Sequence, residues 1–289
     1  MPRISVVIPT FNRQALTERA IASALEQAAD ADIVVIDDAS EPPFRLPTAL
    51  ANVRLFRNES NLGAGPTRSR GVSEAQADWI AFLDSDDHWL PGTLLPRLEE
   101  AERNFAATGD VMTAYAAGFE LVRKATGHSD VRIPRESANL NDFASGCWFC
   151  PGSTLIVHKR AFERVGPFDP TLRRLEDLDW FLRFALAGGK LSVWPHVATK
   201  VEVGVRPQPA AIVQAGEHLR AKYLARPSAT SLPPSAANRL NGYLELELAS
   251  AFAARRNWLA TGYYFTRSWL TVPRLTLHLE RFWRKSDRS

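Results

Sequence analysis

The segment from Ile80 to Asp87 constrains the fold more than any other, because a strand-like apolar run leads directly into a cluster of acids. Its first four residues are all apolar, which is typical of a strand buried on both faces. The last four, Asp84-Ser85-Asp86-Asp87, hold three carboxylates. Clustered carboxylates repel one another and are costly to desolvate, so they favour a hard divalent cation such as Mg²⁺ or Mn²⁺. A solvated acidic turn is the alternative, and this segment alone does not decide between the two.

Two earlier apolar runs, residues 4–8 and 33–36, also end in polar clusters, Pro9–Arg13 and Asp37–Ser40. Segments of helical spacing separate these strands over roughly the first hundred residues, which predicts an α/β layer with a largely parallel sheet. Ligands bind beyond the carboxyl ends of the strands in such sheets. We therefore expect the polar strand ends to form one site. Neither a G-x-G-x-x-G nor a Walker A motif follows the first strand, which argues against dinucleotide and P-loop sites.

Composition narrows the class of protein. The chain has 289 residues, of which 45% are hydrophobic, enough for a large core. We see no apolar run of about 18 residues and no signal peptide after Met1, and the two cysteines, Cys147 and Cys150, argue for a reducing compartment. Their C-x-x-C spacing has no second pair for zinc and no thioredoxin-like context, so we interpret them as ordinary thiols.

Charge is unevenly distributed. Residues 251–289 carry eight Lys/Arg and two Asp/Glu, a net +6, and since the whole chain is +3 the remainder is −3. A basic tail on a mildly acidic body suggests an anionic partner such as a membrane surface. From residue 210 onward the pattern is helical, with helices expected over 240–253, 258–270 and 275–283. We expect the first two to pack on the body and treat membrane contact by Arg274–Ser289 as an open alternative to packing or a dimer contact.

Two central segments are informative in different ways. Glu176-Asp177-Leu178-Asp179 opens a predicted helix, and carboxylates in a first helical turn are favoured by the helix dipole, so a purely structural role is a full alternative to a catalytic one. Gly127–Asn141 is polar, and we expect an irregular, mobile loop that could cover the site.

Six motifs in order resemble the family-2 glycosyltransferases, inverting enzymes with the GT-A nucleotide-diphospho-sugar fold. They are Val6-Val7-Ile8-Pro9-Thr10-Phe11-Asn12, Asp37-Asp38-Ala39-Ser40, Asn61-x-Gly63 with Arg68 and Gly71, Phe82-Leu83-Asp84-Ser85-Asp86-Asp87, Gly166-x-Phe168-Asp169, and Glu176-Asp177-x-Asp179-Trp180-x-Leu182-Arg183. The resemblance covers roughly Ile4 to Pro195. It implies a mostly parallel mixed sheet flanked by helices, with a C-terminal helical extension. We expect a catalytic domain over 1–209, divided into a nucleotide-binding half to about 110 and an acceptor half from about 111, and the extension over 210–289.

The resemblance also implies roles for individual residues. The donor nucleotide-sugar would be bound by Pro9, Thr10, Phe11, Asp38, Arg68, Asp84 and Ser85, with Phe11 beside the base, Asp38 hydrogen-bonded to it and Asp84 facing the ribose. Asp86 would hold Mn²⁺ or Mg²⁺ on the diphosphate with Asp87 nearby. Asp177 would be the general base. Gly152, Ser153, Glu176 and Trp180 would shape the acceptor side. A salt-bridged helix arginine remains the alternative for Arg68.

Two departures qualify the resemblance. Ser69 stands where the family commonly has Asn, and the Gln-x-x-Arg-Trp motif and transmembrane helices of processive polysaccharide synthases are missing. Both omissions of the synthase features favour transfer of one sugar or a few. The expected setting is bacterial surface glycan assembly, with a UDP-sugar as the leading donor, dTDP and GDP open, and a saccharide or lipid-linked acceptor. No nucleic-acid partner is expected. The expected location is cytoplasmic, with contact at the inner membrane face and oligomerisation left open.

Two other functions remain as alternatives. A sugar nucleotidyltransferase usually has a Gly-rich, Arg/Lys-containing loop after the first strand, and Pro9–Arg13 is not one. A degenerate scaffold that only binds carbohydrate or a partner predicts broken carboxylate motifs, whereas these are intact.

Overall fold

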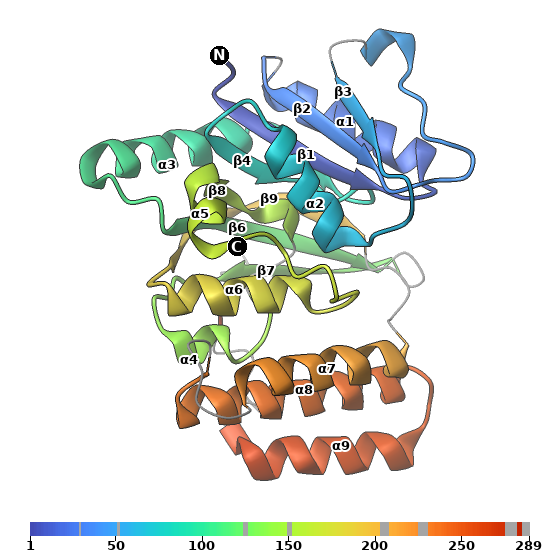
Figure 1. Ribbon diagram of the computed structural model, residues 1–289, viewed down its shortest axis with the longest axis vertical. Coiled ribbons are helices and arrows are strands. Elements are labelled where there is room, and N and C mark those ends of the chain that lie inside the picture. Colours follow the sequence, from blue (N-terminus) through green and yellow to red (C-terminus); the bar gives the residue numbers. More distant parts are fainter. Residues whose placement is uncertain are drawn as a thin grey trace.

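The computed structural model describes residues 1–28, 30–50, 53–123, 127–148, 152–202, 208–224, 231–274 and 282–284. Within them a ten-stranded sheet is flanked by helices, and three further helices form a layer at one end (Figure 1). The strands are β1 Ile4–Thr10, β2 Asp32–Asp37, β3 Arg54–Arg57, β4 Trp79–Phe82, β5 His88–Trp89, β6 Thr113–Arg123, β7 His128–Pro134, β8 Ile156–His158, β9 Lys190–Glu202 and β10 Trp283–Arg284. The α-helices are α1 Gln14–Gln27, α2 Ala64–Glu74, α3 Leu94–Thr108, α4 Leu140–Phe143, α5 Lys159–Val165, α6 Glu176–Leu186, α7 Pro209–Tyr223, α8 Pro234–Ala253 and α9 Trp258–Thr271, with 3-10 turns at Thr48–Leu50 and Gly152–Thr154.

The sheet is mixed, as the sequence predicts. Strands run in the order β10-β7-β6-β8-β4-β1-β2-β3, while β9 pairs with β6 and β5. The four strands β3, β2, β1 and β4 are parallel, and β8 pairs antiparallel to β4. The carboxyl ends of β1, β2 and β4 therefore meet at one edge of the sheet, where the polar clusters lie.

The residues of β1 divide the core between two faces, because successive side chains of a strand point to opposite sides. Ile4, Val6 and Ile8 pack in one cluster with apolar residues of α1 and α3, whereas Val7 packs in the other with residues of α2, α5 and α6. The first strand is thus buried on both faces. The approach of α2 is so close that a Cβ added at Gly71 would lie 2.2 Å from Cγ1 of Val7.

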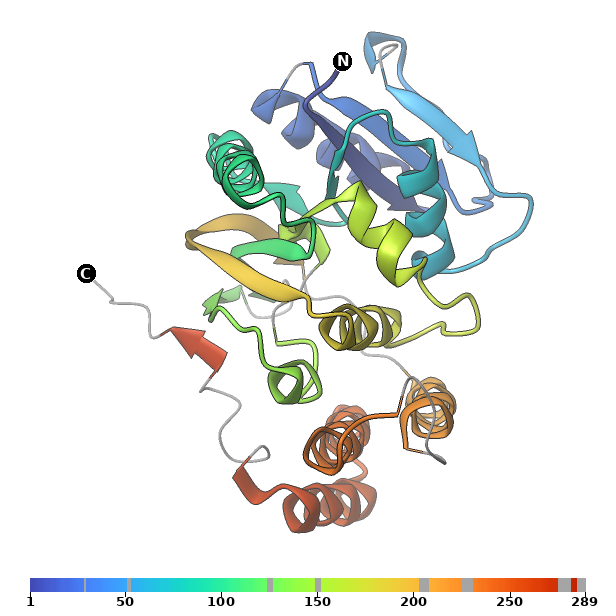
Figure 2. The same cartoon turned by 60° about the vertical axis from the view of Figure 1, so that its left-hand side comes forward.

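The C-terminal helices share the second of these cores. Leu219 and Tyr223 of α7 and Leu240 and Leu244 of α8 belong to the cluster that contains Leu178 of α6. Figures 1 and 2 show α9 outermost, with α7 and α8 between it and the rest of the molecule. The predicted extension therefore packs on the body, while a domain boundary at residue 209 stays a prediction.

Three predictions about the path of the chain were wrong or incomplete. Gly127–Asn141 is not irregular: most of it forms β7, which pairs with β6, and the start of α4, while its movement as a cover for the site stays a prediction. Its strand was missed because its side chains are largely polar and exposed. Strand β9 was not predicted. The helix expected over 275–283 falls mostly outside the described residues, and its end is instead strand β10, which pairs with β7.

Candidate active site

A cavity of about 380 Å³ lies at the carboxyl ends of β1, β2 and β4. It is lined by Pro9, Thr10, Phe11, Arg13, Asp38, Asn61, Gly63, Ala64, Thr67, Arg68, Asp84, Ser85 and Asp86. The structure thus brings together every residue predicted to bind the donor, and Asp86 with them. Phe11 is 44% exposed, which leaves its ring free to contact a ligand.

Asp38 is buried in the wall of this cavity. Its Oδ1 accepts hydrogen bonds from the backbone N–H of Leu62 (2.9 Å) and from Asn58 Nδ2 (2.8 Å), and its Oδ2 accepts one from the N–H of Gly63 (2.8 Å). These bonds fix the loop between β3 and α2 against the end of β2. A nucleobase that binds in this cavity would therefore meet an Asp38 carboxylate that the protein already holds in a fixed position.

Three non-glycine residues with left-handed backbone flank this site. Asn12 (φ 55°) follows Phe11, Ala39 (φ 61°) follows Asp38, and Leu175 (φ 62°) precedes Glu176. Side chains other than glycine disfavour this region, and such strain concentrates at functional sites. Asn tolerates this region better than most residues, so Ala39 and Leu175 are the two unusual positions, and each lies next to a residue of the site.

Arg68 joins the two halves of the site. Its Nη2 lies 2.7 Å from Oδ1 of Asp84, at the end of β4, and its Nη1 lies 3.2 Å from Oε1 of Glu176 and 3.4 Å from Oδ1 of Asp177, in the first turn of α6. The Arg68 side chain is only 7% exposed. These salt bridges agree with a structural role for Arg68. Its three partners are also predicted site residues, so the same contacts are compatible with a role in the site.

Asp177 has an unusual protonation equilibrium. Burial raises the pKa of its carboxyl to about 7; the positive charge of Arg68 opposes this rise, and the carboxylates of Glu176 and Asp84 add to it. A group of this pKa exchanges a proton near neutral pH, which is the property a general base requires. A quarter of its side chain is accessible to solvent. The site therefore contains a carboxylate that can accept a proton from a bound molecule.

Asp86 and Asp87 lie in different surroundings. Asp86 lines the cavity and forms an ion pair with Arg13 (Oδ2 to Nη1, 2.7 Å). Asp87 is buried beneath it, where its Oδ2 accepts a hydrogen bond from Ser153 Oγ (2.5 Å) and its Oδ1 accepts one from the N–H of Glu202 (3.3 Å). Burial, helped by the charge of Asp84, raises the pKa of Asp87 to about 8.

These surroundings test the metal assignment. In the described parts of the chain, no group of three or more His, Cys, Asp or Glu side chains is arranged to hold a metal ion. Mg²⁺ sites, however, commonly use one or two carboxylates together with substrate phosphates. Asp86, on the cavity wall, fits that chemistry. Asp87 faces Ser153 and is absent from the cavity lining, so a supporting role suits it better.

The residues predicted for the acceptor side are more buried than expected. Ser153 is fully buried, and its Oγ bridges Asp87 and the backbone N–H of Asp84 (3.0 Å). Trp180 is also buried: its Nε1 donates to the carbonyl of Gly166 (3.0 Å), and its ring stacks on Phe184. Both side chains support the site from the core of the protein and do not line the cavity. Gly152 and Glu176 do lie beside Arg68.

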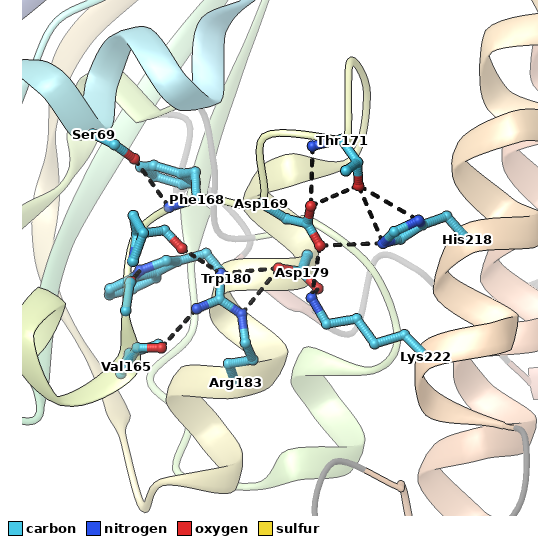
Figure 3. A network of polar contacts seen from close by, with 12 residues as sticks. Ser69, Val165, Phe168, Asp169, Thr171, Asp179, Trp180, Arg183, His218 and Lys222 are labelled. Atoms are coloured by element: carbon cyan, nitrogen blue, oxygen red, sulfur yellow. Dashed lines mark hydrogen bonds and ion pairs between the residues drawn. The ribbon is translucent and has the colours of Figure 1, made fainter.

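A polar network connects α6 to the helical extension (Figure 3). Lys222 of α7 places its Nζ 2.7 Å from Oδ1 of Asp179 and 2.9 Å from Oδ2 of Asp169. His218 also contacts Asp169 (3.1 Å), and Arg183 pairs with the second oxygen of Asp179 (2.9 Å). The Asp179 side chain is completely buried. The network therefore anchors the motif segments around residues 169 and 179 to α7.

Several contributors were not predicted from the sequence. Arg13 lines the cavity, and Arg19 joins Glu202 (2.8 Å) to the carbonyl of Asp86 (2.9 Å). Buried Arg97 donates to the carbonyls of Thr93 (2.9 Å) and Thr154 (2.8 Å) and so supports the turn that carries Ser153. Only Arg13, which follows the first motif directly, carried a signal in the sequence. Cys147 is partly buried, and burial raises the pKa of its thiol; Cys150 lies outside the described residues.

Comparison with known sequences identifies the family to which the chain is similar. A family model described as "Glycosyl transferase family 2" matches residues 5–166. The chain is 26% identical over 186 residues to an uncharacterized glycosyltransferase of Haemophilus influenzae, covering 62% of this chain and 61% of that protein. It is 30% identical over 213 residues to the succinoglycan biosynthesis protein ExoW of Rhizobium meliloti, covering 66% of each. It is 35% identical over 114 residues to a Campylobacter jejuni protein, GalNAc(5)-diNAcBac-PP-undecaprenol beta-1,3-glucosyltransferase, covering 37% of each. The chain thus matches between 37% and 66% of the length of these relatives.

Solved structures share the fold. TarS of S. aureus (residues 1–349), in complex with UDP-GlcNAc, aligns with a TM-score of 0.60 at 15% identity, covering 96% of this chain and 84% of that one. The complex of the same protein with UDP aligns with a TM-score of 0.59 at 17% identity, covering 96% and 83%. These alignments establish the GT-A fold that the sequence predicts. Among the described residues, no helix is both long and apolar enough to cross a membrane.

Proposed function

The chain belongs to glycosyl transferase family 2, and on this basis we propose that it transfers a sugar from a nucleotide-diphosphate donor to an acceptor hydroxyl with inversion at the anomeric carbon. The observation that carries the proposal is the convergence of the cavity at the strand ends with Asp177, whose pKa is raised to about 7. The cavity offers a place for a nucleotide, and Asp177 offers a base beside it.

The chemistry follows from these positions. Asp177 takes the proton of the acceptor hydroxyl, and the acceptor oxygen forms a bond to the anomeric carbon on the face opposite the diphosphate. The bond from that carbon to the phosphate oxygen breaks, and the nucleoside diphosphate leaves with the electron pair. Arg13 lines the cavity and is partly exposed, so it can meet the charge that develops on the leaving group.

We assign Asp86 as the residue that would hold Mn²⁺ or Mg²⁺ when the donor binds. When bound, such an ion acts as a Lewis acid that neutralises charge on the phosphates. Nη1 of Arg13 lies 2.7 Å from Oδ2 of Asp86. Because the Arg13 side chain is 46% exposed, it can move away from Asp86 or turn toward the phosphates.

The donor and acceptor are proposed by likeness. TarS binds UDP and UDP-GlcNAc, which makes a UDP-sugar the leading donor, with dTDP and GDP as the next candidates. The named relatives include a succinoglycan biosynthesis protein and an enzyme whose name specifies an undecaprenyl-diphosphate-linked substrate. These names fit a saccharide or lipid-linked acceptor in bacterial surface glycan assembly. We place the reaction on the cytoplasmic side as part of the same proposal.

A thermal-shift screen of UDP, dTDP, GDP and CMP, each with and without Mn²⁺, tests the proposal. Ligand that binds only the folded state stabilises it by about 2.7 kcal/mol at a hundredfold excess over the dissociation constant. We expect one nucleoside diphosphate to raise the melting temperature, and to need Mn²⁺ for its full effect. Asp86→Ala should remove the dependence on Mn²⁺, whereas Asp130→Ala, on β7, should keep it.

Other results would change the conclusion. A shift with every nucleotide that is indifferent to Mn²⁺ would remove Asp86 as the metal ligand. No shift with any nucleotide would favour a degenerate scaffold that binds carbohydrate or a partner. A sugar nucleotidyltransferase would instead convert a nucleoside triphosphate and a sugar phosphate to diphosphate and a nucleotide sugar, which a direct assay detects.

A further inference from the structure

The outward face of α9 is apolar to an unusual degree. Of the large hydrophobic side chains that are exposed in the described part of the chain, six belong to this helix: Trp258, Leu259, Tyr263, Phe265, Trp269 and Leu270. Leu259 is 90% exposed and Leu270 is 68% exposed. Single exposed apolar residues are ordinary, but a contiguous group of this kind marks an interaction surface.

Contacts with α8 fix the rotation of α9. Ser268 Oγ donates to the carbonyl of Gly242 (2.8 Å), the rings of Tyr264 and Phe252 are stacked with centroids 5.4 Å apart, and Arg267 pairs with buried Glu245 (3.0 Å). A helix turns by about 100° per residue, so Leu259, Tyr263 and Leu270 fall on the side opposite Ser268, while Trp258, Phe265 and Trp269 lie on one flank, about 60° to 100° around the helix from it. Figure 2 shows α9 at the edge of the molecule.

The charges around this face have one sign. Residues 248–274 contain four arginines and no Asp or Glu. Arg255 and Arg256 precede the helix and Arg274 follows it, and all three are exposed. Arg255 donates to Gln208 (3.2 Å), which leaves Arg256 and Arg274 as the outward cations at the two ends. The only charged residue on α9 is Arg267, which turns toward Glu245.

The apolar face of α9 and its flanking arginines together favour one kind of binding partner. A second copy of the chain would bring arginine against arginine at the ends of the paired helices, with no acid in residues 248–274 to compensate. A helix with Trp, Phe and Leu on one face and flanking arginines suits the boundary between lipid headgroups and acyl chains. Its cations also complement anionic headgroups.

We propose that α9 docks on the surface of an anionic lipid bilayer, with its aromatic and leucine side chains at the headgroup boundary and Arg256 and Arg274 at the lipid phosphates. The sequence alone suggested contact by Arg274–Ser289 and packing for the segment before it; the geometry points to α9. The inference goes beyond the proposed function, and its test requires no transfer activity.

Co-sedimentation of the full chain with vesicles tests it. We expect binding to vesicles of phosphatidylcholine with phosphatidylglycerol, and weak binding to phosphatidylcholine alone. The triple variant Leu259→Ser, Trp269→Ser, Leu270→Ser should lose about tenfold or more in partition coefficient, because binding scales with the apolar area that enters the interface. The double variant Arg256→Glu, Arg274→Glu should lose binding to the anionic vesicles.

The control is Leu95→Ser, which changes a partly exposed leucine on α3 and should bind as the unchanged protein does. All substituted positions are exposed, so melting temperatures should stay within a few degrees, and a variant that fails this check is replaced by the single change Leu259→Ser. Failure of the unchanged chain to sediment, or normal binding by the triple variant, would overturn the proposal. Concentration-dependent dimerisation that the triple variant abolishes would also overturn it, in favour of an interface between copies.

Discussion

Nη1 of Arg68 lies 3.4 Å from Oδ1 of Asp177, although 109 positions separate the two residues in the sequence. The same guanidinium contacts Glu176 and Asp84, so one cation serves three carboxylates. This imbalance helps to raise the pKa of Asp177. The contacts of Arg68 also connect the end of β4, which lines the cavity, to the helix that carries Asp177, the proposed base. The contact makes the proposed mechanism testable at single residues.

Asp177→Asn should abolish most transfer while leaving donor binding intact. The amide keeps the shape of the side chain but cannot take the acceptor proton, and general base catalysis typically contributes about 10²–10⁴-fold. We expect kcat to fall by that factor and the Kd for the nucleotide to stay nearly unchanged, because Asp177 is not part of the cavity lining. Asp130→Asn, a solvent-facing carboxylate on β7, is the matched control. Near-normal transfer by the Asp177 variant would assign the base elsewhere.

The pH dependence of transfer should report the same group. Asp177 works only when deprotonated, and its pKa in the free protein is about 7, so kcat/KM should rise about tenfold per pH unit well below 7 and level off above it. The charge of Arg68 lowers this pKa, so Arg68→Met should move the limb to higher pH, and Arg68→Lys should restore it in part. The check is a pH–rate profile for all three proteins. A flat profile between about pH 5.5 and 8 would contradict the assignment of this pKa to the base.

The parts of the molecule that were predictable are those with a local signature. Strands β1, β2 and β4 are mainly apolar and β-branched or aromatic, and the polar residues at their ends meet because the strands are parallel neighbours. From Pro9 to Asp86, every cavity residue predicted to bind donor or metal therefore lay in a motif that the sequence displays. The predicted residues that do not line the cavity are placed by tertiary contacts. Ser153 and Trp180 proved to be buried, and Asp87 turned toward Ser153, because side-chain direction is set by packing that spacing does not encode.

Long-range partners explain the other omissions. Strand β9 and strand β7 carry mixed polar sequences and are held by pairing with β6, so no apolar period marks them. Lys222 and His218 lie in a segment whose sequence pattern predicts a helix but not its partners. Their carboxylate partners are 43 to 53 residues away in the sequence. The outward face of α9 contains hydrophobic residues that a sequence pattern assigns to packing, and only the structure shows that they are exposed.

Substitution of glycine by alanine should have opposite effects in α2 and α9. At Gly71 the new methyl group would lie 2.2 Å from Cγ1 of Val7, and overpacking of a core costs about 1–3 kcal/mol. Gly262 on α9 has no atom within 4 Å of its added Cβ, so Gly262→Ala should gain up to about 1 kcal/mol from helix propensity. Chemical denaturation of both variants measures the free energy of unfolding. Equal effects would show that the close approach of α2 to β1 relaxes at little cost.

Lys222→Met should loosen the attachment of the helical extension, and the effect should depend on pH. The change removes a cation from buried Asp179, which keeps Arg183 and the hydroxyl of Tyr223 (2.8 Å), and we expect a loss of about 1–3 kcal/mol at pH 7. Burial alone would raise the pKa of Asp169, but hydrogen bonds from Thr171 and Lys222 hold it well below its usual 3.8.

A carboxylate whose pKa is lowered by folding contributes stability above its unfolded pKa, and this contribution is lost as the pH falls through the folded pKa. The difference between the variant and the unchanged protein should therefore be full at pH 7 and shrink below about pH 4. Urea denaturation at pH 7 and at a pH below about 4 measures this difference in the free energy of unfolding. Lys200→Met, which removes an exposed pair with Glu120 (3.7 Å), should cost less than about 0.5 kcal/mol. A loss for Lys222→Met that is equal at the two pH values would mean that packing of the Lys222 side chain, and not its charge, attaches α7 to the motif segments around Asp169 and Asp179.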